Sequence, residues 1–248
     1  MKLSEVFKQL SYGELSQLNI GGSGSGEIND ADYDRLVAAI NLGLTALHTR
    51  FPLCKKQLEL QLVSGQGLYY LNRAYAVSNE ESTEDPKYIL DSNDNPFMDD
   101  LLKVVDVTTA EGVRLELNRR GSEWSLHTPT LVSLQVPEGM HTPTSSTPTE
   151  YVTGSLLVDY QANHLYLPAG VGEYRADTVE LALPYPYLEA LLYYVASRMH
   201  NPVGMVNEFH MGNSYSAKYE MACQLLERHN VSVDQVGVTT KFSDRGWV

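Results

Sequence analysis

Residues 183–204 read LPYPYLEALLYYVASRMHNPVG, a run that predicts one helix followed by a sharp break. Apolar side chains recur at i, i+3, i+4, i+7 and i+11 from Leu188 to Met199, which places them on one helical face. Pro202 disfavours helical geometry in the residue before it, so we expect this helix to end near His200. The glycine that follows accommodates a turn, and the chain can reverse there.

A second amphipathic helix is expected to pack back against the first and to end near His229. We place the connection between the two helices at residues 201–213. The apolar stripe of the second helix repeats at helical spacing and consists of Tyr215, Tyr219, Ala222, Cys223 and Leu226.

A third helix is predicted near the N-terminus. Asn29 or Asp30 can cap it, its apolar face continues up to Arg50, and Pro52 ends it. Such a face needs a partner, and the two C-terminal helices are the obvious candidates. The face consists of Tyr33, Leu36, Val37, Ile40, Leu44 and Leu47. Before it, residues 3–17 suggest a short amphipathic helix, and the Gly/Ser run at 21–26 a linker or exposed loop.

Between residues 58 and 183 the apolar period changes to two, which is typical of half-buried strands. Seven short strands separated by turn residues favour a β-sandwich or a small barrel. The candidate strands are 58–62, 68–71, 101–107, 113–117, 131–136, 155–160 and 178–183. Residues 137–149 are rich in threonine and proline, and we expect a long exposed loop there.

The order of these elements predicts an α+β protein. Helices from both ends of the chain would form a bundle, into which an antiparallel β-sandwich or barrel-like module is inserted. The predicted boundaries are 1–57 and 184–230 for the discontinuous bundle, 58–183 for the β domain and 231–248 for an extended C-terminal tail.

Composition argues against several classes of protein. No apolar run approaches the roughly 18 residues of a membrane-spanning helix, so no membrane anchor is expected. The N-terminal residues lack the apolar core of a signal peptide. A formal net charge of −13 argues against a protein that grips nucleic-acid phosphates. Cys54 and Cys223 lie far apart in sequence, and we expect buried free thiols in a reducing compartment.

An acidic run lies between residues 80 and 100, where Lys87 is the one basic residue. Its carboxylates belong to Glu80, Glu81, Glu84, Asp85, Asp91, Asp94, Asp99 and Asp100. The simpler interpretation is a solvated loop. The alternative is a surface that repels DNA and keeps it from adhering.

No motif predicts catalysis, a metal or a cofactor. Residues 91–95 begin like a calcium loop, but Pro96 replaces the required glycine and Leu102 the bidentate glutamate, so an Asx-rich turn is preferred. The histidines lack zinc-site spacing and are expected to be structural or exposed. They are His48, His127, His141, His164, His200, His210 and His229. A carboxylate pair assembled only in the fold would leave no fixed spacing.

Tyrosine is in excess, with 16 residues concentrated at 69–70, 151–193 and 215–219. A core position is the simpler interpretation for any single tyrosine. Tyrosine also gives a large contact area with a polar tip and is enriched at protein interfaces. The dense group at Tyr185, Tyr187, Tyr193 and Tyr194 therefore favours an interface.

The run from Pro184 to Arg198 ends in Ala-Ser-Arg and is followed, after the break, by an acidic second helix. That helix carries Glu208, Tyr219, Glu220, Cys223, Leu226 and Glu227. This pattern resembles the end of the head-to-tail adaptor proteins of tailed bacteriophages, which are also called connector, neck or tail tubular A-like proteins. The layout of N-terminal helices, β module and C-terminal helix pair is similar over nearly the whole chain.

The resemblance implies a homo-oligomeric ring, dodecameric in that family, with no catalysis. The ring would lie in the virion neck, between the capsid portal and the tail, after synthesis in the host bacterial cytoplasm. Its partners would be other copies of itself, the phage portal protein and a tail or nozzle protein, and genomic DNA would pass through its channel without sequence-specific binding. Candidate ring-interface residues are Tyr187, Tyr193, Tyr194, Arg198, Tyr215 and Tyr219.

In that family the C-terminal tail reaches into the portal, and the matching segment is 231–248. The residues fit this role independently, because aromatic and arginine side chains are the usual anchors of protein interfaces. The candidate docking residues are Phe242, Arg245, Trp247 and Val248.

The alternative function is a tail-associated protein that binds or hydrolyses carbohydrate, with sugar rings held by the tyrosine-rich β module. A third possibility is a host enzyme whose site the sequence does not reveal. It would require a deep pocket with convergent carboxylates.

Overall fold

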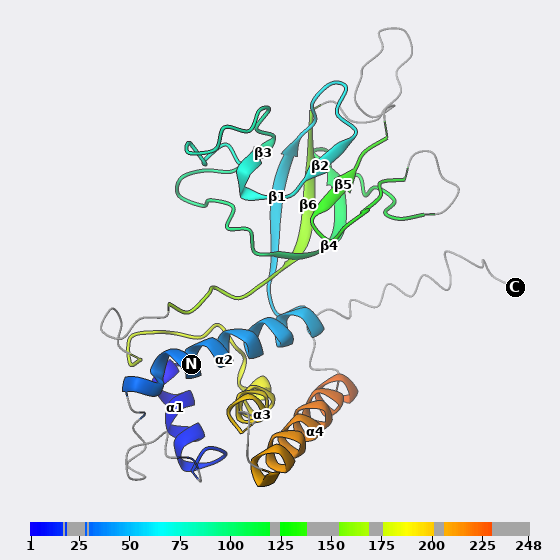
Figure 1. Cartoon of the computed structure of the whole chain (residues 1–248). Coiled ribbons are helices and arrows are strands. Elements are labelled where there is room, and N and C mark those ends of the chain that lie inside the picture. The colour runs from blue at the N-terminus through cyan, green and yellow to red at the C-terminus, as the bar shows by residue number, and fades with distance from the viewer. Residues whose placement is uncertain are drawn as a thin grey trace, which may run out of the picture. The chain divides into compact units, whose positions relative to one another are not determined.

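Two units make up the chain in the computed structural model, which describes residues 1–16, 18, 28, 30–119, 125–137, 154–168, 176–200 and 206–229. The helical unit comprises Met1–Leu53 and His164–Val248, and the β unit comprises Cys54–Asn163 (Figure 1). The predicted α+β class is confirmed, with helices from both chain ends packed together and antiparallel sheets between them in sequence. The unit boundaries fall at 53/54 and 163/164, whereas the sequence placed them at 57/58 and 183/184.

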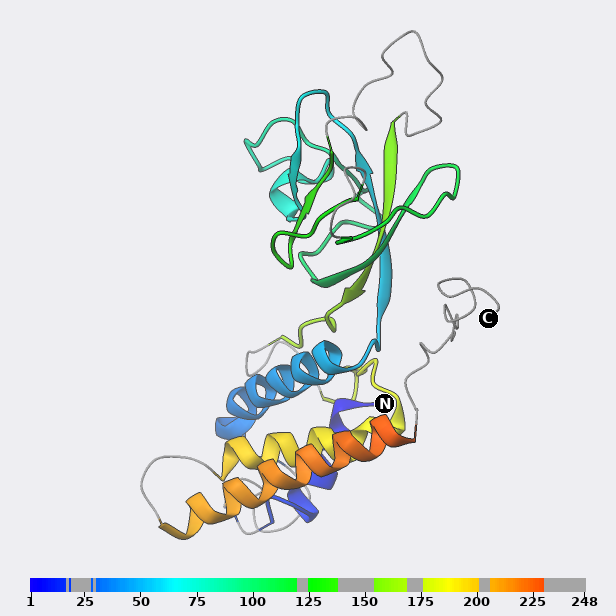
Figure 2. The same ribbon diagram turned by 90° about the vertical axis from the view of Figure 1, so that its right-hand side faces the viewer.

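Helix α3 (Leu188–Met199) is the centre of the helical unit. It packs against α1 (Leu3–Tyr12), α2 (Asp30–Arg50) and α4 (Val206–Arg228), and Figure 2 shows it between α2 and α4. A short 3-10 helix, η4 (Tyr185–Tyr187), leads into it. Burial from several sides explains why its sequence is so apolar. Its buried residues are Leu188, Ala190, Leu191, Leu192, Val195, Ala196 and Met199.

The helices begin and end close to where periodicity placed them, with one difference. Helix α3 ends before His200, whose N–H bonds to the carbonyl of Ala196, as predicted. Helix α4 begins at Val206, so the connection cannot extend to residue 213 as we expected. Asn213 has helical geometry, and residues 206–213 contain no proline that would prevent it. The Gly/Ser run at 21–26 lies outside the described residues.

The predicted strand at 178–183 is wrong. This segment instead lies along the start of α1, where the first N–H groups of a helix have no partner within the helix. Leu3 and Ser4 donate to the carbonyls of Val179 and Ala176, both at 3.0 Å, and Leu181 donates to the carbonyl of Met1 at 2.7 Å. Alternating polarity therefore marks a capping segment of the helical unit here.

Two antiparallel sheets form the β unit. The larger has the order β3-β1-β6-β4 and the smaller pairs β2 with β5. The strands are β1 (Lys55–Gln61), β2 (Leu68–Tyr70), β3 (Ile89–Leu90), β4 (Leu101–Thr109), β5 (Ser133–Gln135) and β6 (Ser155–Ala162). Alternate residues of the larger sheet point into a core, as Leu58 and Leu60 of β1 and Leu156 and Val158 of β6 illustrate.

Isolated bridges link the edges of the two sheets. They pair Thr108 with Arg114, Leu117 with Leu126, His127 with Gln135 and Ala76 with Ile89. The predicted strand at 113–117 thus contributes two bridges only, because it bonds to different partners at its two ends. The two-residue strand β3 was missed, since so short a run carries no periodicity.

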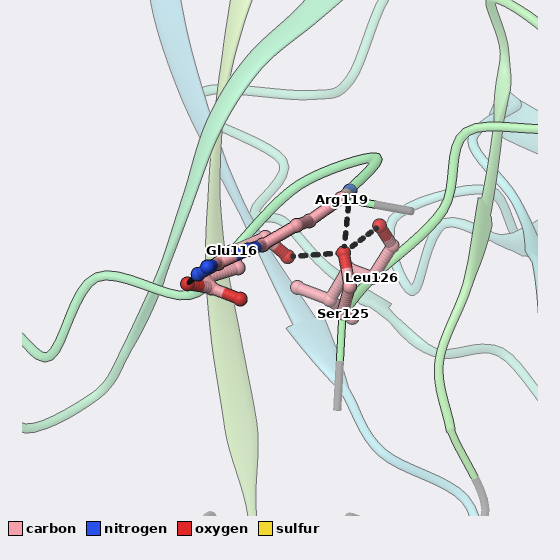
Figure 3. A network of polar contacts seen from close by, with 4 residues as sticks. All are labelled: Glu116, Arg119, Ser125 and Leu126. Carbon is pink, nitrogen blue, oxygen red and sulfur yellow. Dashed lines mark hydrogen bonds and ion pairs between the residues drawn. The ribbon is translucent and has the colours of Figure 1, made fainter. Parts of the chain in front are cut away.

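Ser125 holds two of these bridged segments together (Figure 3). Its side chain is 1% exposed, and its Oγ accepts a hydrogen bond from the N–H of Arg119 at 2.9 Å. The same hydroxyl lies 3.2 Å from the carbonyl oxygens of Glu116 and Leu126, to which it can donate. The guanidinium of Arg119 also pairs with the carboxylate of Glu116. One buried hydroxyl therefore serves backbone groups of both segments.

Replacing Ser125 with Ala should lower the free energy of unfolding by about 1–3 kcal/mol, because the N–H of Arg119 loses its acceptor. Urea denaturation followed by circular dichroism measures this. The matched control is Ser64→Ala, at an exposed turn position, which should change stability by less than about 0.5 kcal/mol. Equal stability of the two variants would show that water replaces the lost hydroxyl.

Candidate interaction surface

Five of the six predicted interface residues come together where α3 meets α4. Tyr193, Tyr194 and Arg198 lie on α3, and Tyr215 and Tyr219 lie on α4. The rings of Tyr194 and Tyr219 are edge to face with centroids 5.2 Å apart, and those of Tyr193 and Tyr215 are 6.2 Å apart. Each of the four tyrosines is half-buried. The sequence therefore identified residues that do converge, although they first of all hold the two helices together.

Tyr187, the sixth, lies in the core. Its side chain is 1% exposed and packs edge to face on Phe51, with ring centroids 5.1 Å apart. As the last residue of η4, it turns inward just before α3 begins. We therefore assign it to the core of the protomer and not to a surface that another copy could contact.

Two cations lie against the four tyrosines at the contact of α3 and α4, which we call the tyrosine cluster. The guanidinium carbon of Arg198 lies 5.4 Å from the centre of the Tyr194 ring, and the same side chain donates to the Tyr194 hydroxyl at 3.2 Å. The ammonium of Lys218 lies 4.8 Å from the centre of the Tyr215 ring and 5.7 Å from that of Tyr193. Contacts of this kind are worth about 0.5–1 kcal/mol at exposed sites. The cluster presents positive charge beside aromatic edges.

The phenols of the cluster differ in their surroundings. The Tyr193 hydroxyl donates to Oε1 of Glu189 at 2.8 Å, and this hydrogen bond raises the pKa of Tyr193 to about 12. Burial is the main cause that raises the pKa of Tyr219, whose hydroxyl bonds to the Cys223 thiol. Burial likewise raises the pKa of the Cys223 thiol, which is free, as is that of Cys54. The predicted free thiols are confirmed, although Cys54 is only half-buried.

Helix α4 also carries three exposed apolar side chains outside its buried stripe, which were not predicted from the sequence. Met211, Met221 and Leu225 are 37%, 63% and 48% exposed, whereas Cys223 and Leu226 are buried against α3. At about 100° per residue, Met221 and Leu225 are neighbours on one side of the helix, and Met211 lies on the same side about 15 Å away along the axis, with Ser214 and Lys218 between them. The spacings of 10 and 4 residues between these side chains are visible in the sequence, but the tyrosine stripe of the same helix repeats more clearly. We call Met211, Met221 and Leu225 the outer stripe.

Arg50, the last residue of α2, also holds α4 in place through two ion pairs. Its guanidinium bonds Oε1 of Glu227 at 2.7 Å and Oε2 of Glu220 at 2.8 Å. Both hydrogen bonds raise the pKa of Arg50, and the one to Glu227 has the larger effect. The two carboxylates are thus neutralised within the protomer, at the end of α2. The orientation of α4, and with it the direction in which the outer stripe points, is set by these ion pairs and by the tyrosine cluster.

A buried polar contact joins the segment 164–167, which follows β6, to α2. Asn41 donates its Nδ2 to the carbonyl of Leu167 at 3.0 Å and accepts from the N–H of Leu167 at 2.9 Å. His164 is 9% exposed, with Nε2 3.1 Å from the carbonyl of Asn41 and Nδ1 2.8 Å from the carbonyl of Leu165. Burial lowers the pKa of His164 below its ordinary value. This histidine is structural, as the sequence suggested.

The lowered pKa of His164 predicts a pH dependence of stability. The folded chain binds the proton less readily than the unfolded chain, whose histidine pKa is about 6.5. Stability from this group is therefore present above about pH 6.5 and is lost as the pH falls, with a slope of at most about 1.4 kcal/mol per unit. Denaturation of the wild type and His164→Gln at pH 7.5 and 5.5 measures the slope, which should be smaller in the variant. A slope equal in the wild type and the variant would contradict the assignment.

Part of the acidic run is built into the fold. Asp91 accepts hydrogen bonds from the N–H of Ser78 at 2.8 Å and of Phe97 at 2.9 Å, and from the Ser78 hydroxyl at 2.5 Å. Burial opposes ionisation of Asp91, but these hydrogen bonds lower its pKa below the ordinary value. Asp100 pairs with Lys56 at 2.5 Å. The turn rich in Asn and Asp that the sequence favoured is present at residues 92–95, where the N–H of Asn95 donates to the carbonyl of Ser92 at 3.0 Å. The bonds of Asp91 and Asp100 show that the run is not simply a solvated loop.

Possible catalytic and metal sites have little support among the described residues. Asp106 and Asp159 stand opposite each other in β4 and β6, which sequence spacing could not reveal. Asp106 is paired with Arg114 at 2.8 Å, and Asp159 accepts from Gln57 at 2.8 Å. In the part of the chain that the structure describes, no group of three or more His, Cys, Asp or Glu side chains could hold a metal ion.

The predicted docking residues of the tail, at 242, 245, 247 and 248, lie outside the described residues. So does almost all of the Thr/Pro-rich segment 137–149. Among the described helices, none combines the length and the apolar character that a membrane crossing requires.

Comparison with models of known protein families and with curated proteins gave no match for the chain.

Proposed function

We propose that this chain is a virion structural protein: a ring-forming head-to-tail adaptor of a tailed bacteriophage. Copies of the chain would form a closed ring in the virion neck, dock on the portal protein, extend the DNA channel and provide the platform for a tail or nozzle protein. Genomic DNA would pass without sequence-specific binding, and no catalysis is involved.

The observation that carries this proposal is that α4 has apolar side chains on two of its sides. One face is buried against α3 and the other, the outer stripe, is exposed in the protomer. An exposed apolar stripe beside the half-exposed tyrosines, with Lys218 and Arg198 next to them, has the composition of a protein interface. In a ring, one such patch meets a different patch on the next copy, and the rotation closes the assembly.

The charge of the chain also supports the proposal. The net charge of −13 disfavours adhesion to DNA, which suits a channel through which DNA must slide. Glu80, Glu81, Glu84 and Asp85 remain exposed in the β unit and could face such a channel.

The assembly state tests the proposal. Size-exclusion chromatography with light scattering, with and without the cognate portal protein, should show a ring or a portal-bound ring, and electron micrographs should show its closed symmetry. A chain that stays a monomer at all concentrations and never binds portal would refute the proposal.

Removing residues 231–248 should leave the thermal unfolding of the protein unchanged and weaken portal binding by about a hundredfold, because aromatic and arginine anchors carry much of an interface. Binding of the full chain and of the shortened chain to immobilised portal measures this. If the shortened chain fails to fold, the segment belongs to the core and the docking role is wrong.

A second candidate function is carbohydrate binding by the β unit, and one observation favours it. Tyr75 stacks on Tyr88 with centroids 4.7 Å apart and on Tyr70 with centroids 6.3 Å apart, and Tyr70 is 47% exposed. An exposed aromatic ring backed by a rigid stack can hold the apolar face of a sugar. Binding to a glycan panel that is lost in Tyr70→Ala would favour this function over the adaptor.

A further inference from the structure

We propose that the β unit binds an extended, basic peptide segment of a partner protein as an added strand beside β1. The site is a groove of about 640 Å³ between β1 and the loop 91–97. Strand addition to a sheet edge is a common mode of peptide recognition. This inference is independent of ring formation and of portal binding.

Strand β1 is only partly covered on one side. It pairs with β6 along its whole length, from Lys55 to Gln61, but with β3 only at Glu59 and Leu60. The N–H of Gln61 donates to the carbonyl of Tyr88, so its backbone groups point toward β3. Backbone groups in a strand alternate sides, and those of Gln57 therefore point the same way. Among the residues that the structure describes, no strand pairs with Gln57 on that side.

The loop after β3 creates the groove. Asp91 binds the N–H of Ser78 and the N–H of Phe97, and this draws the chain away from β1 directly after Leu90. Without this bond, β3 could continue alongside Gln57. An edge left open in this way offers unpaired hydrogen-bonding groups to another chain.

The walls of the groove suit a strand with alternating side chains. On the core side lie Phe97 and Tyr160, whose rings meet edge to face at 6.1 Å, and the Tyr160 hydroxyl donates to Asp100 at 3.0 Å. On the outer side lie Leu90, 38% exposed, and Leu157, which stand on either side of Glu59. The volume falls within the range of about 300–1,000 Å³ that is usual for ligand sites.

Charge selects a basic occupant. Lys56, the one basic residue that lines the groove, is paired with Asp100 at 2.5 Å. Glu59 in the wall and Asp94 in the adjoining loop are exposed, and no described residue forms an ion pair with either. Lysine or arginine at alternate positions of the added strand would complement these carboxylates, whereas an acidic segment would be repelled.

The test uses the full-length protein and a synthetic seven-residue peptide of alternating lysine and valine, blocked at both ends. Isothermal titration calorimetry should show saturable binding. Methylating alternate backbone nitrogens of the peptide, on the edge that pairs with β1, should weaken binding by about tenfold or more, since it removes the strand-pairing donors. A peptide with glutamate in place of lysine should not bind.

Two variants locate the binding. Gln57→Pro removes the outward N–H at an edge position, where proline is tolerated, and should weaken binding by about tenfold or more. Gln57→Ala keeps that N–H while losing the side-chain bond to Asp159, so it is the matched control and should bind normally. Glu59→Lys, which leaves the backbone unchanged, should reverse the preference toward the acidic peptide even if Gln57→Pro does not fold.

Several results would overturn the proposal. Binding that ignores backbone methylation, or that falls equally in Gln57→Pro and Gln57→Ala, would exclude strand addition. Equal affinity for the basic and acidic peptides would exclude the charge argument. Self-association through this edge, or binding of a neutral oligosaccharide with no binding of the peptide, would assign the groove to another occupant. Ring assembly and portal binding should be unaffected by Gln57→Pro, so failure here leaves the proposed function standing.

Discussion

Replacing Met221 with Glu should convert the proposed ring into monomers while the protomer keeps its fold. Met221 is 63% exposed in the protomer, so a carboxylate there stays solvated and costs the monomer little. In the assembled ring the outer stripe would be covered by the next copy, and the new charge would be buried against apolar atoms. That burial costs several kcal/mol at each contact, and 1.4 kcal/mol corresponds to a factor of ten in affinity. We expect each contact to weaken by about a hundredfold or more.

Light scattering at matched concentrations measures the loss of assembly, and thermal unfolding checks the protomer. Leu42→Glu is the matched control, because Leu42 is 52% exposed on α2, away from the outer stripe. It should assemble normally. If Met221→Glu assembles like the wild type while Leu42→Glu does not, the ring contact lies on α2 and the outer stripe has been misassigned.

The helices could be predicted well because the information for them is local. A stripe that repeats every three to four residues identifies a buried face whatever it packs against, and α3 ended near His200 as the proline break required. The tyrosine cluster was not predicted as a contact within the protomer: the density of tyrosine led us to expect a ring interface, and the structure places these rings where α3 meets α4. Tyr187 was misassigned because a high density of tyrosine does not distinguish an exposed ring from a core ring, and Tyr187, in η4, is buried.

The strands were less predictable because pairing partners are distant in sequence. Residues 178–183 alternate in polarity, yet they satisfy the first N–H groups of α1 instead of joining a sheet. Strand β3 is too short to carry a pattern, and it ends where Asp91 binds Ser78 and Phe97. The groove beside β1 depends on that bond, and so it could not be foreseen from the acidic run alone.

The outer stripe escaped the sequence analysis for a different reason. A helix with one clear apolar face satisfies the expectation for a surface helix, so a second face is easily read as scattered exposed residues. Only the orientation of α4, fixed by Arg50 with Glu220 and Glu227, shows that the stripe is exposed as a unit. The packing of a helix decides which of its faces stays exposed, and the periodicity of the sequence does not show this.

Replacing Gly43 with a larger residue should destabilise the helical unit more than any exposed substitution on α2. Gly43 lies at the closest approach of α2 to α3: a Cβ there would stand 2.7 Å from Cδ1 of Leu191 and 2.9 Å from Cδ1 of Tyr194. Neither neighbour can move freely, because Leu191 is fully buried and Tyr194 packs on Tyr219. Overpacking of this kind costs about 1–3 kcal/mol, whereas alanine returns only about 1 kcal/mol of helix propensity.

We therefore expect Gly43→Ala to lower the free energy of unfolding by up to about 2 kcal/mol, and Gly43→Val to lower it by about 3 kcal/mol or more. Denaturant unfolding measures both, with Leu42→Ala, exposed on the same helix, as the control that should stay near the wild type. A double-mutant cycle identifies the cause. Leu191→Ala alone opens a cavity, but in the double variant that space accommodates the new methyl group of Gly43→Ala. The loss of stability in the double variant should therefore be smaller than the sum of the two single losses, by about 1 kcal/mol or more. Strict additivity would mean that α2 and α3 separate slightly to relieve the clash. In that case Tyr194 moves away from Gly43 together with α3, and its contact with Arg198 on the same helix is kept.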